Sequence, residues 1–324
     1  MSIKTKRADR NMPLRIDFAL VNVSTDPELR EYVFAPDPER YKHFTDESGE
    51  WYLDLLDPRS LAFDLRAIEQ ALALAQDIPV TYMRPDIPDV EAYIASRLPS
   101  IREGLINGLP PSPVRDSADD ELRTVVSERR EFVIASVDLV GSTKLSQAVN
   151  DETFANIVQT FSSELAQMCL HFHGRPLKFM GDGAILYFPI GSFIRRHDMA
   201  IDLAVSLRDL ILTAINSVLV ELGLPQLACR IGIDSGTAIV KMVGDSGSTN
   251  HVDIIGELVS IATKIEKAAP VNGICVGEST VINSHTHWLK HMKLVPPPVD
   301  WPYHEPGSDA PYRIYLLDIP ASAS

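Results

Sequence analysis

Two short segments near the middle of the chain constrain its fold more than any other part. The first, residues 132–143, is an apolar and β-branched run that ends in Asp138 and continues into a Gly-Ser-Thr turn. This pattern is typical of a buried strand that leads into the start of a helix. The second, residues 178–187, has two apolar runs joined by Gly-Asp-Gly with Asp182 at its centre, which is a strong β-hairpin signal.

Adjacent packing of these strands would bring two carboxylates together. Asp138 would lie at one strand end and Asp182 at the tip of the neighbouring hairpin, beside a turn with free backbone N–H groups. Hard divalent cations such as Mg²⁺ bind carboxylate oxygens and leave positions for substrate phosphates. Backbone N–H groups at a helix start can donate to phosphate oxygens. The pattern therefore predicts a site for divalent metals and phosphates, and two metals could promote displacement at phosphorus.

Composition excludes several other classes of protein. The chain has 324 residues, of which 45% are hydrophobic and 23% are charged, and its net charge is −14. No basic surface is available to bind a nucleic acid through its phosphates. No apolar stretch reaches the roughly 18 uncharged residues of a membrane span, and the N-terminus has no apolar signal region, so no membrane association is expected. The three cysteines are isolated, which favours a reducing compartment, and we expect a cytoplasmic protein.

The order of expected elements predicts an α/β (α+β) fold with a boundary near residue 120. Residues 1–120 are interpreted as an N-terminal extension and linker of unknown role, with helical spacing over residues 60–76 and 89–108 and a Pro-rich linker from residue 109. Residues 121–324 alternate strands and helices. A strand to Asp138, a helix, the Gly-Asp-Gly hairpin, a long helix over residues 192–223 and further strands give a ferredoxin-like βαββαβ order. We also expect a second hairpin across Ser235-Gly236.

Four motifs follow one another along this second part of the chain: Val137-Asp-Leu-Val-Gly-Ser-Thr143, Lys178-Phe-Met-Gly-Asp182, Arg230-Ile-Gly-Ile-Asp-Ser-Gly236, and Asp253-Ile-Ile-Gly-Glu-Leu-Val-Ser260-Ile-Ala-Thr-Lys264-Ile-Glu266. Together they resemble the catalytic domain of the class III nucleotidyl cyclases, the adenylate and guanylate cyclase family, over residues 132–283. Any one of these motifs alone would be weak evidence for the family.

The resemblance implies roles for the residues around the two aspartates. Two divalent cations, Mn²⁺ or Mg²⁺, would be bound by Asp138, Leu139 and Asp182. The triphosphate would face the turn formed by Val140, Gly141, Ser142 and Thr143. Family members build each site at a homodimer interface, with the metals on one subunit and the other groups on its partner. A homodimer that binds a nucleoside triphosphate is therefore expected.

The remaining implied site residues depart in part from the family pattern. Lys178 and Asp253 match the pair that reads the base edge in adenylate cyclases. Ser260 and Lys264 stand where the family usually has an Asn that orients the ribose and an Arg that steadies the transition-state phosphate. Lysine keeps the positive charge but loses the planar fork of arginine, and serine is shorter. For the terminal phosphates, the sequence does not choose between Lys241, Lys290 and Lys293.

The combination of these departures with an N-terminal extension is similar to the bacterial pyrimidine cyclases of anti-phage (Pycsar) systems. This resemblance implies conversion of UTP to cyclic UMP, a second messenger that a separate effector protein would read. Three alternatives stay open: an adenylate cyclase that makes cyclic AMP, a degenerate cyclase-like module that binds nucleotide for regulation, and a metal-dependent phosphodiesterase or polymerase-like enzyme on the same fold.

Overall fold

The computed structural model describes residues 16–22, 32–47, 49–57, 62–64, 85–110, 117–188, 196–245, 250–305 and 307–320. The chain divides into two compact units. The first unit comprises residues 1–82 and 282–290, and the second comprises residues 83–281 and 291–324. A segment from late in the chain thus belongs to the N-terminal unit, and each unit is described by itself.

The first unit contains a two-stranded and a three-stranded antiparallel sheet. Its described elements are β1 (Phe18–Asn22), β2 (Tyr32–Pro36), β3 (Tyr41–Asp46), β4 (Gly49–Asp54), β5 (Ala62–Asp64) and the short helix α10 (Thr286–Leu289). Most of the helix predicted over residues 60–76 lies outside the described residues. Residues 62–64 contradict that prediction, because they pair with β4 as a strand, and Phe63 packs edge-on against Tyr41.

A buried arginine joins the late segment to the rest of the first unit. The guanidinium of Arg40 donates to Asp54 at 2.9 Å, to Asp17 at 2.7 Å and to the carbonyl of Ser284 at 3.3 Å. Asp17 also accepts from the backbone N–H and the hydroxyl of Thr286. Because Arg40 is only 1% exposed, removal of either acid would leave its buried charge with one of its two carboxylate partners missing, which is destabilising.

An eight-stranded sheet forms the centre of the second unit, with seven strands in the order β12-β13-β11-β9-β6-β8-β7 and β10 paired to β9. All pairs are antiparallel except β11 with β9. The strands are β6 (Arg129–Leu139), β7 (Arg175–Met180), β8 (Gly183–Phe188), β9 (Cys229–Val243), β10 (His251–Ile255), β11 (Ile274–Gly277), β12 (Met292–Val295) and β13 (Ile314–Leu317).

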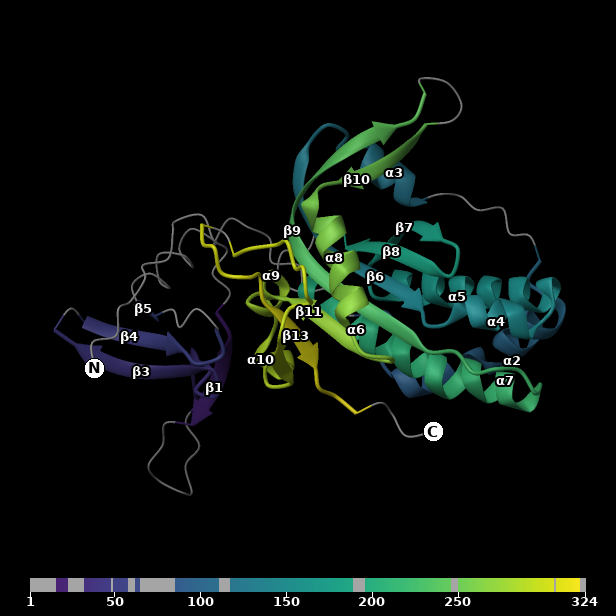
Figure 1. Ribbon diagram of the computed structural model, residues 1–324. Coiled ribbons are helices and arrows are strands. Elements are labelled where there is room, and N and C mark those ends of the chain that lie inside the picture. Colours follow the sequence, from purple (N-terminus) through teal and green to yellow (C-terminus); the bar gives the residue numbers. More distant parts are fainter. Residues whose placement is uncertain are drawn as a thin grey trace. The chain divides into compact units, whose positions relative to one another are not determined.

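Helices cover both faces of this sheet (Figure 1). Helix α8 lies on one face, and α5 and α6 lie on the other. The helices of the unit are α2 (Val90–Asn107), α3 (Ser117–Arg123), α4 (Ser142–Ala148), α5 (Asp151–His171), α6 (Arg196–Asp209), the π-helical η1 (Leu210–Ile215), α7 (Asn216–Glu221), α8 (Glu257–Ala268) and α9 (Glu278–Val281). On the α8 side, Phe132, Ile134, Ile185 and Tyr187 pack with Leu258 and Ala262 in one apolar cluster.

The predicted fold class is confirmed by this topology. Strands β6, β7, β8 and β9 with the helices between them follow the full βαββαβ order, and their arrangement β9-β6-β8-β7 is that of a ferredoxin-like sheet. Helix α8 then leads into β11, which extends the sheet beside β9.

The domain boundary near residue 120 stays a prediction. Helix α2, on its N-terminal side, packs against α5 in the second unit, where Arg97 forms two 2.8 Å hydrogen bonds to Glu164.

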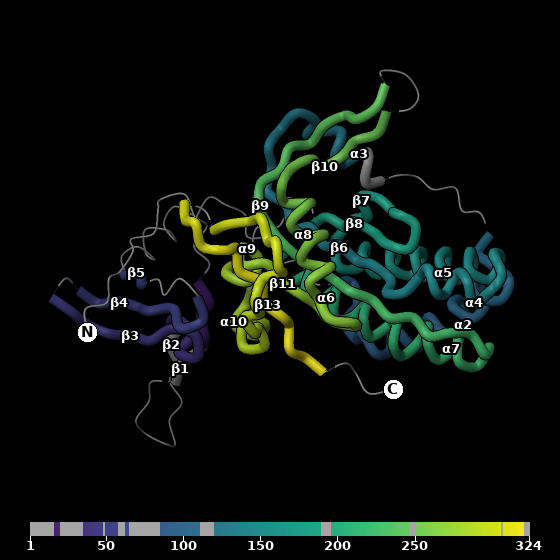
Figure 2. Tube along the Cα trace, viewed as in Figure 1, coloured from purple at the N-terminus to yellow at the C-terminus, as the bar shows by residue number. Residues whose placement is uncertain are grey.

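One expected turn is wrong. The hairpin predicted across Ser235-Gly236 does not form, because both residues continue β9 and pair with Val133 and Phe132 of β6. Gly236 does not adopt a positive φ, so it supplies no turn here. The chain reverses after Val243 instead, where β9 pairs with β10, and Figure 2 shows this long hairpin extending beyond the rest of the sheet.

One helical segment in the described part of the chain has the length and hydropathy of a membrane span. Residues 196–221 run through α6, η1 and α7 with a mean hydropathy of 1.7 over their apolar window, and 72% of that window is buried inside the protein. Burial of this kind is expected for a core helix that packs on a sheet.

Helix α8 is held against the sheet by a residue without a side chain. A Cβ added to Gly232 of β9 would lie 2.1 Å from the backbone nitrogen of Glu266 and 2.5 Å from the carbonyl oxygen of Ala262. The helix backbone therefore rests directly on the strand, closer than any other residue type would allow. This contact sets the distance between α8 and the strands beneath it.

We predict that Gly232→Ala destabilises the protein by about 3 kcal/mol, the upper end of the usual range for overpacking, because helix backbone must move to admit the methyl group. Gly236→Ala on the same strand is the matched control, since its nearest neighbour would be a flexible Leu258 carbon at 3.8 Å. Urea unfolding of both variants measures the difference. Equal stability of the two variants would contradict the close contact at Gly232.

Candidate active site

Strand pairing brings the two predicted metal-binding aspartates to the same end of the sheet. Asp138, near the end of β6, pairs with Gly183 of β8, and Asp182 precedes Gly183 in the tight turn from β7. A Cβ at Gly183 would lie 3.1 Å from Oδ1 of Asp138, so the second glycine leaves room for that carboxylate. The first, Gly181, has a φ of +67°, a conformation that glycine adopts without strain.

The electrostatics of this end of the sheet suit a cation. Partial burial raises the pKa of Asp138 above its ordinary value, and the nearby Asp182 raises it further, whereas Arg230 and Lys267 act in the opposite direction. Two carboxylates that repel each other are stabilised when a cation binds between them. Among the described residues, no group of three or more His, Cys, Asp or Glu side chains could by itself hold a metal. A cation here would need further oxygen ligands from water or substrate, as Mg²⁺ usually has.

The turn after β6 has less free backbone than the sequence suggested. Leu139 pairs with Cys229 at the end of the sheet, and the N–H of Val140 donates to the carbonyl of Ala228 at 2.8 Å. That N–H is therefore not available to a phosphate. Gly141, with a φ of +80°, precedes helix α4, which begins at Ser142 and includes Thr143. The roles of these residues toward metal and phosphate stay predictions.

The predicted base-reading pair forms a direct contact within one chain. Nζ of Lys178 on β7 lies 2.7 Å from Oδ2 of Asp253 on β10, with the two side chains 38% and 14% exposed. A β-bulge between Pro176 and Lys178 shifts the register of β7 at this point. The other oxygen, Oδ1 of Asp253, accepts from the backbone N–H of Ile254 at 2.9 Å. The pair therefore presents one donor group beside one acceptor group at the surface.

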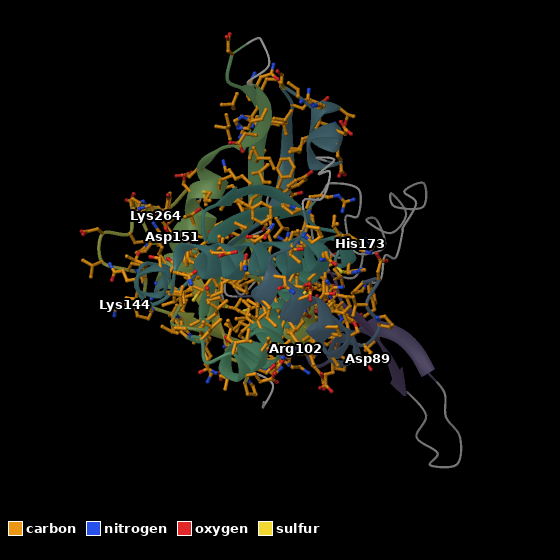
Figure 3. All side chains as sticks on the ribbon, turned by 90° about the vertical axis from the view of Figure 1, so that its right-hand side faces the viewer. Asp89, Arg102, Lys144, Asp151, His173 and Lys264 are labelled. Atoms are coloured by element: carbon orange, nitrogen blue, oxygen red, sulfur yellow. The ribbon has the colours of Figure 1, made fainter. Side chains whose placement is uncertain are left out.

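Ser260 and Lys264 lie on the solvent-exposed face of α8, one helical turn apart. Figure 3 shows Lys264 on the same side of the view as Lys144 of α4 and Asp151 of α5, opposite His173 and Asp89. Lys264 is not among the charged groups that shift the pKa of Asp138, but Lys267 is. Lys267, on the same exposed stripe of α8, lowers the pKa of Asp138 within one chain.

Three residues near Asp138 were missed by the sequence reasoning: Arg230, Glu266 and Lys267. Arg230 pairs with Asp138 across β9 and β6, and its buried Nε has no hydrogen-bond partner among the described residues. Glu266 is buried between α8 and the sheet. Its pKa is raised to about 7, first by desolvation and then by the charge of Asp138. Arg230 begins one of the quoted motifs and Glu266 ends another. Only the pairing of β9 with β6 and the packing of α8 on the sheet show that they lie near Asp138.

The three lysines considered for the terminal phosphates have other partners. Lys290, which belongs to the first unit, forms an ion pair with Glu39, and Lys293 forms one with Asp318. Nζ of Lys241 lies 3.2 Å from Oγ of Ser127. Arg230 is the cation that strand pairing sets opposite Asp138.

Comparisons with known proteins agree with this fold and with the part of the chain that contains the candidate site. Residues 125–293 match the adenylate and guanylate cyclase catalytic domain family. An uncharacterized protein of Rhizobium meliloti is 28% identical over 153 residues, which are 47% of this chain and 14% of that protein. An adenylate cyclase of Streptomyces coelicolor is 25% identical over 147 residues, which are 45% of this chain and 32% of that protein. The match therefore spans under a third of each curated relative.

Solved structures show the same fold. The guanylyl cyclase Cya2 is similar with a TM-score of 0.52 and 23% identity, over 59% of this chain and 93% of that one. The adenylyl cyclase CyaB from P. aeruginosa is similar with a TM-score of 0.50 and 20% identity, over 60% of this chain and 98% of that one.

We predict that Asp138→Asn abolishes stabilisation by Mn²⁺ without lowering the stability of the metal-free protein, because the change removes one of two repelling charges. At a Mn²⁺ concentration about 100 times the dissociation constant, the wild-type protein gains about 2.7 kcal/mol. Calorimetric unfolding with and without Mn²⁺ measures this gain. Asp120→Asn, at an exposed position on α3, should keep the full response, and a wild-type protein that does not respond to Mn²⁺ would refute the assignment.

Proposed function

The chain belongs to the adenylate and guanylate cyclase catalytic domain family, and from this premise we propose that it converts a nucleoside triphosphate, UTP, to the 3′,5′-cyclic nucleotide and pyrophosphate. The convergence of Asp138 with Asp182 at the end of β6 carries the proposal. In the reaction, the ribose 3′ oxygen loses its proton to solvent and forms a bond to the α-phosphorus. The bond from that phosphorus to the oxygen bridging to the β-phosphorus breaks, and pyrophosphate leaves.

Two divalent cations, Mn²⁺ or Mg²⁺, are the proposed cofactors. The residues fit them, because the site offers two oxygen-donor carboxylates that repel each other and a glycine that leaves room beside one of them. When bound, such cations lower the pKa of the attacking hydroxyl and neutralise charge on the triphosphate. Asp138 and Asp182 would hold them, with Leu139 at the end of the same strand.

Positively charged side chains are proposed to bind the phosphates. Arg230 lies beside Asp138, and the fork of a guanidinium can grip two phosphate oxygens. Lys264 is proposed to stabilise the charge that develops on the α-phosphate during bond exchange. Because lysine lacks the fork, it supplies charge at this point without fixing two oxygens. Ser260, one turn earlier on α8, is proposed to orient the ribose through its single hydroxyl.

A homodimer with shared sites is proposed because the groups lie on different sides of helix α8. Lys264 is on the exposed side of the helix, whereas the buried side packs on the strand that bears Asp138, so the proposed role of Lys264 uses the aspartates of a second copy. Lys178 and Asp253 come from one chain, since they bond each other. Phe179 and Met180, next to Lys178 on the edge strand β7, are 46% and 49% exposed. A second copy that covers them would bury this apolar surface.

The choice of UTP rests on the resemblance to the pyrimidine cyclases and on hydrogen-bond chemistry. Uracil has a carbonyl oxygen that would accept from Lys178 and an adjacent N–H that would donate to Asp253. Adenine can use the same pair with its ring nitrogen and amino group, and for this reason an adenylate cyclase is the second candidate. A second-messenger role in anti-phage defence, with an effector protein that reads the product, rests on the sequence resemblance alone.

The deciding experiment is incubation of the purified protein with ATP, GTP, CTP or UTP separately, with Mn²⁺ or Mg²⁺, and identification of products by mass spectrometry. We expect cyclic UMP and pyrophosphate. Cyclic AMP as the main product would replace the uridylate proposal by the adenylate candidate. Absence of a cyclic product from all four nucleotides would overturn the proposed activity and favour a nucleotide-binding module.

We predict that Lys264→Ala lowers kcat by about 10²–10³-fold, as expected for loss of one group that stabilises charge in the transition state. If the sites are shared, equal amounts of Lys264→Ala and Asp138→Ala should together regain about a quarter of wild-type activity, because half of the random dimers contain one intact site out of two. Initial rates of each variant and of the mixture measure this. No gain on mixing would contradict the shared site, and an unchanged kcat would remove Lys264 from the mechanism.

A further inference from the structure

Helix α8 carries a charged residue on its buried side. Ser260, Lys264 and Lys267 form its exposed stripe, whereas Leu258, Ala262, Ile265 and Glu266 face the sheet. Glu266 is only 3% exposed. A carboxylate at an apolar contact between helix and sheet is costly unless other groups compensate for its charge.

The hydrogen bonds of Glu266 do not compensate for this burial. Its Oε2 accepts from the hydroxyl of Ser136 at 3.4 Å, which is long for a hydrogen bond between oxygens. Its Oε1 is buried and has no hydrogen-bond partner among the described residues. No ion-pair partner lies within 4.0 Å of Glu266 in the described part of the chain. A buried polar atom without a partner calls for an explanation, such as a functional role or a bound ion.

The position of Glu266 connects it to the proposed cation site. Ser136 pairs with Gly232, the residue on which the backbone of Glu266 rests. Residues two apart on a strand point to the same face, so Ser136 and Asp138 both face α8. Asp138 is the largest charge acting on Glu266, and Lys267 and Arg230 act on it with the opposite sign. The carboxylate of Glu266 therefore lies between α8 and the sheet, close to Asp138. Arg230 and Lys267 act on both carboxylates.

We propose that Glu266 is a positioning residue for the divalent cations, whose buried carboxylate strengthens their binding at Asp138 and Asp182 from the α8 side of β6 without ligating them. The inference rests on the proposed function, because that function supplies the cations. A negative charge in a poorly solvated position acts strongly on a nearby cation. Residues behind the ligands of a metal typically change its affinity by about 10–100-fold. The charge that is costly in the metal-free protein becomes favourable when cations bind.

A structural role alone can be separated from this electrostatic role by the choice of variants. Glu266→Gln keeps the size of the side chain and an oxygen that can accept from Ser136, so it removes little besides the charge. Glu266→Asp keeps the charge and shortens the side chain. Glu278→Gln is the matched control, since Glu278 is also buried at 6% exposure but pairs with Arg313 at 2.9 Å.

Mn²⁺ binding measured by electron paramagnetic resonance tests the proposal directly, on the full chain, with Mn²⁺ alone and with a 3′-deoxynucleoside triphosphate that cannot cyclise. We expect the dissociation constant of Mn²⁺ to rise by about 10–100-fold in Glu266→Gln and by less in Glu266→Asp. Glu278→Gln should bind Mn²⁺ as the wild type does. The unfolding temperature of metal-free Glu266→Gln should equal or exceed that of the wild type, because the change removes a buried charge.

The proposal is overturned if Glu266→Gln binds Mn²⁺ as tightly as the wild type, if Glu266→Asp loses as much affinity as Glu266→Gln, or if the wild type binds no Mn²⁺ in either condition. Failure of the proposed function has a different signature. A wild type that makes no cyclic nucleotide but loses Mn²⁺ affinity through Glu266→Gln would refute the cyclase activity and leave the role of Glu266 intact.

Discussion

The antiparallel pairing of β6 with β8 is the interaction on which the candidate site depends. It sets Asp138 opposite Gly183 and so brings Asp182 to the same end of the sheet. A slip of one residue would turn Asp138 toward the face covered by α5 and α6, because side chains alternate along a strand. Residues 132–137 of β6 are buried on both faces, and a strand buried in this way has a strongly specified register. The hydrophobic core therefore holds together two carboxylates that repel each other.

Helix α8 connects this core with two different functions. Its buried stripe rests on Gly232 and faces the strand that bears Asp138, whereas its exposed stripe presents Ser260 and Lys264 outward. In the proposed homodimer, one side of the helix would serve the cations of its own chain through Glu266, and the other side would serve the phosphate of the partner's site. Because a helix moves as a rigid element, a shift of α8 would alter both sites together. The close contact at Gly232 opposes such a shift.

The sequence predicted those strands and turns whose formation depends on neighbouring residues in the chain. The strand that ends near Asp138 forms as β6, as its apolar and β-branched run predicted, and the Gly-Asp-Gly hairpin forms as expected. The continuous strand β9 was missed, because Ser-Gly is typical of turns, and only the pairing of these residues with β6 shows that they continue the strand. Arg230 and Glu266 were missed for a similar reason. Each meets Asp138 only through the packing of elements about 90 to 130 residues apart in the chain.

The contact between Lys178 and Asp253 limits what this pair can contribute to base choice. It offers one donor group beside one acceptor group, and every nucleobase has an acceptor next to a donor somewhere on its hydrogen-bonding edge. The pair can therefore orient a base without identifying it. A purine is longer than a pyrimidine between the sugar and this edge, so discrimination must come from the distance between the pair and the groups that hold the ribose and phosphate. In the proposed cyclase that distance is set by how α8, with Ser260 and Lys264, lies relative to β7 and β10. Changes at the ribose side of the pocket can thus alter the preferred base while the pair that contacts it stays the same.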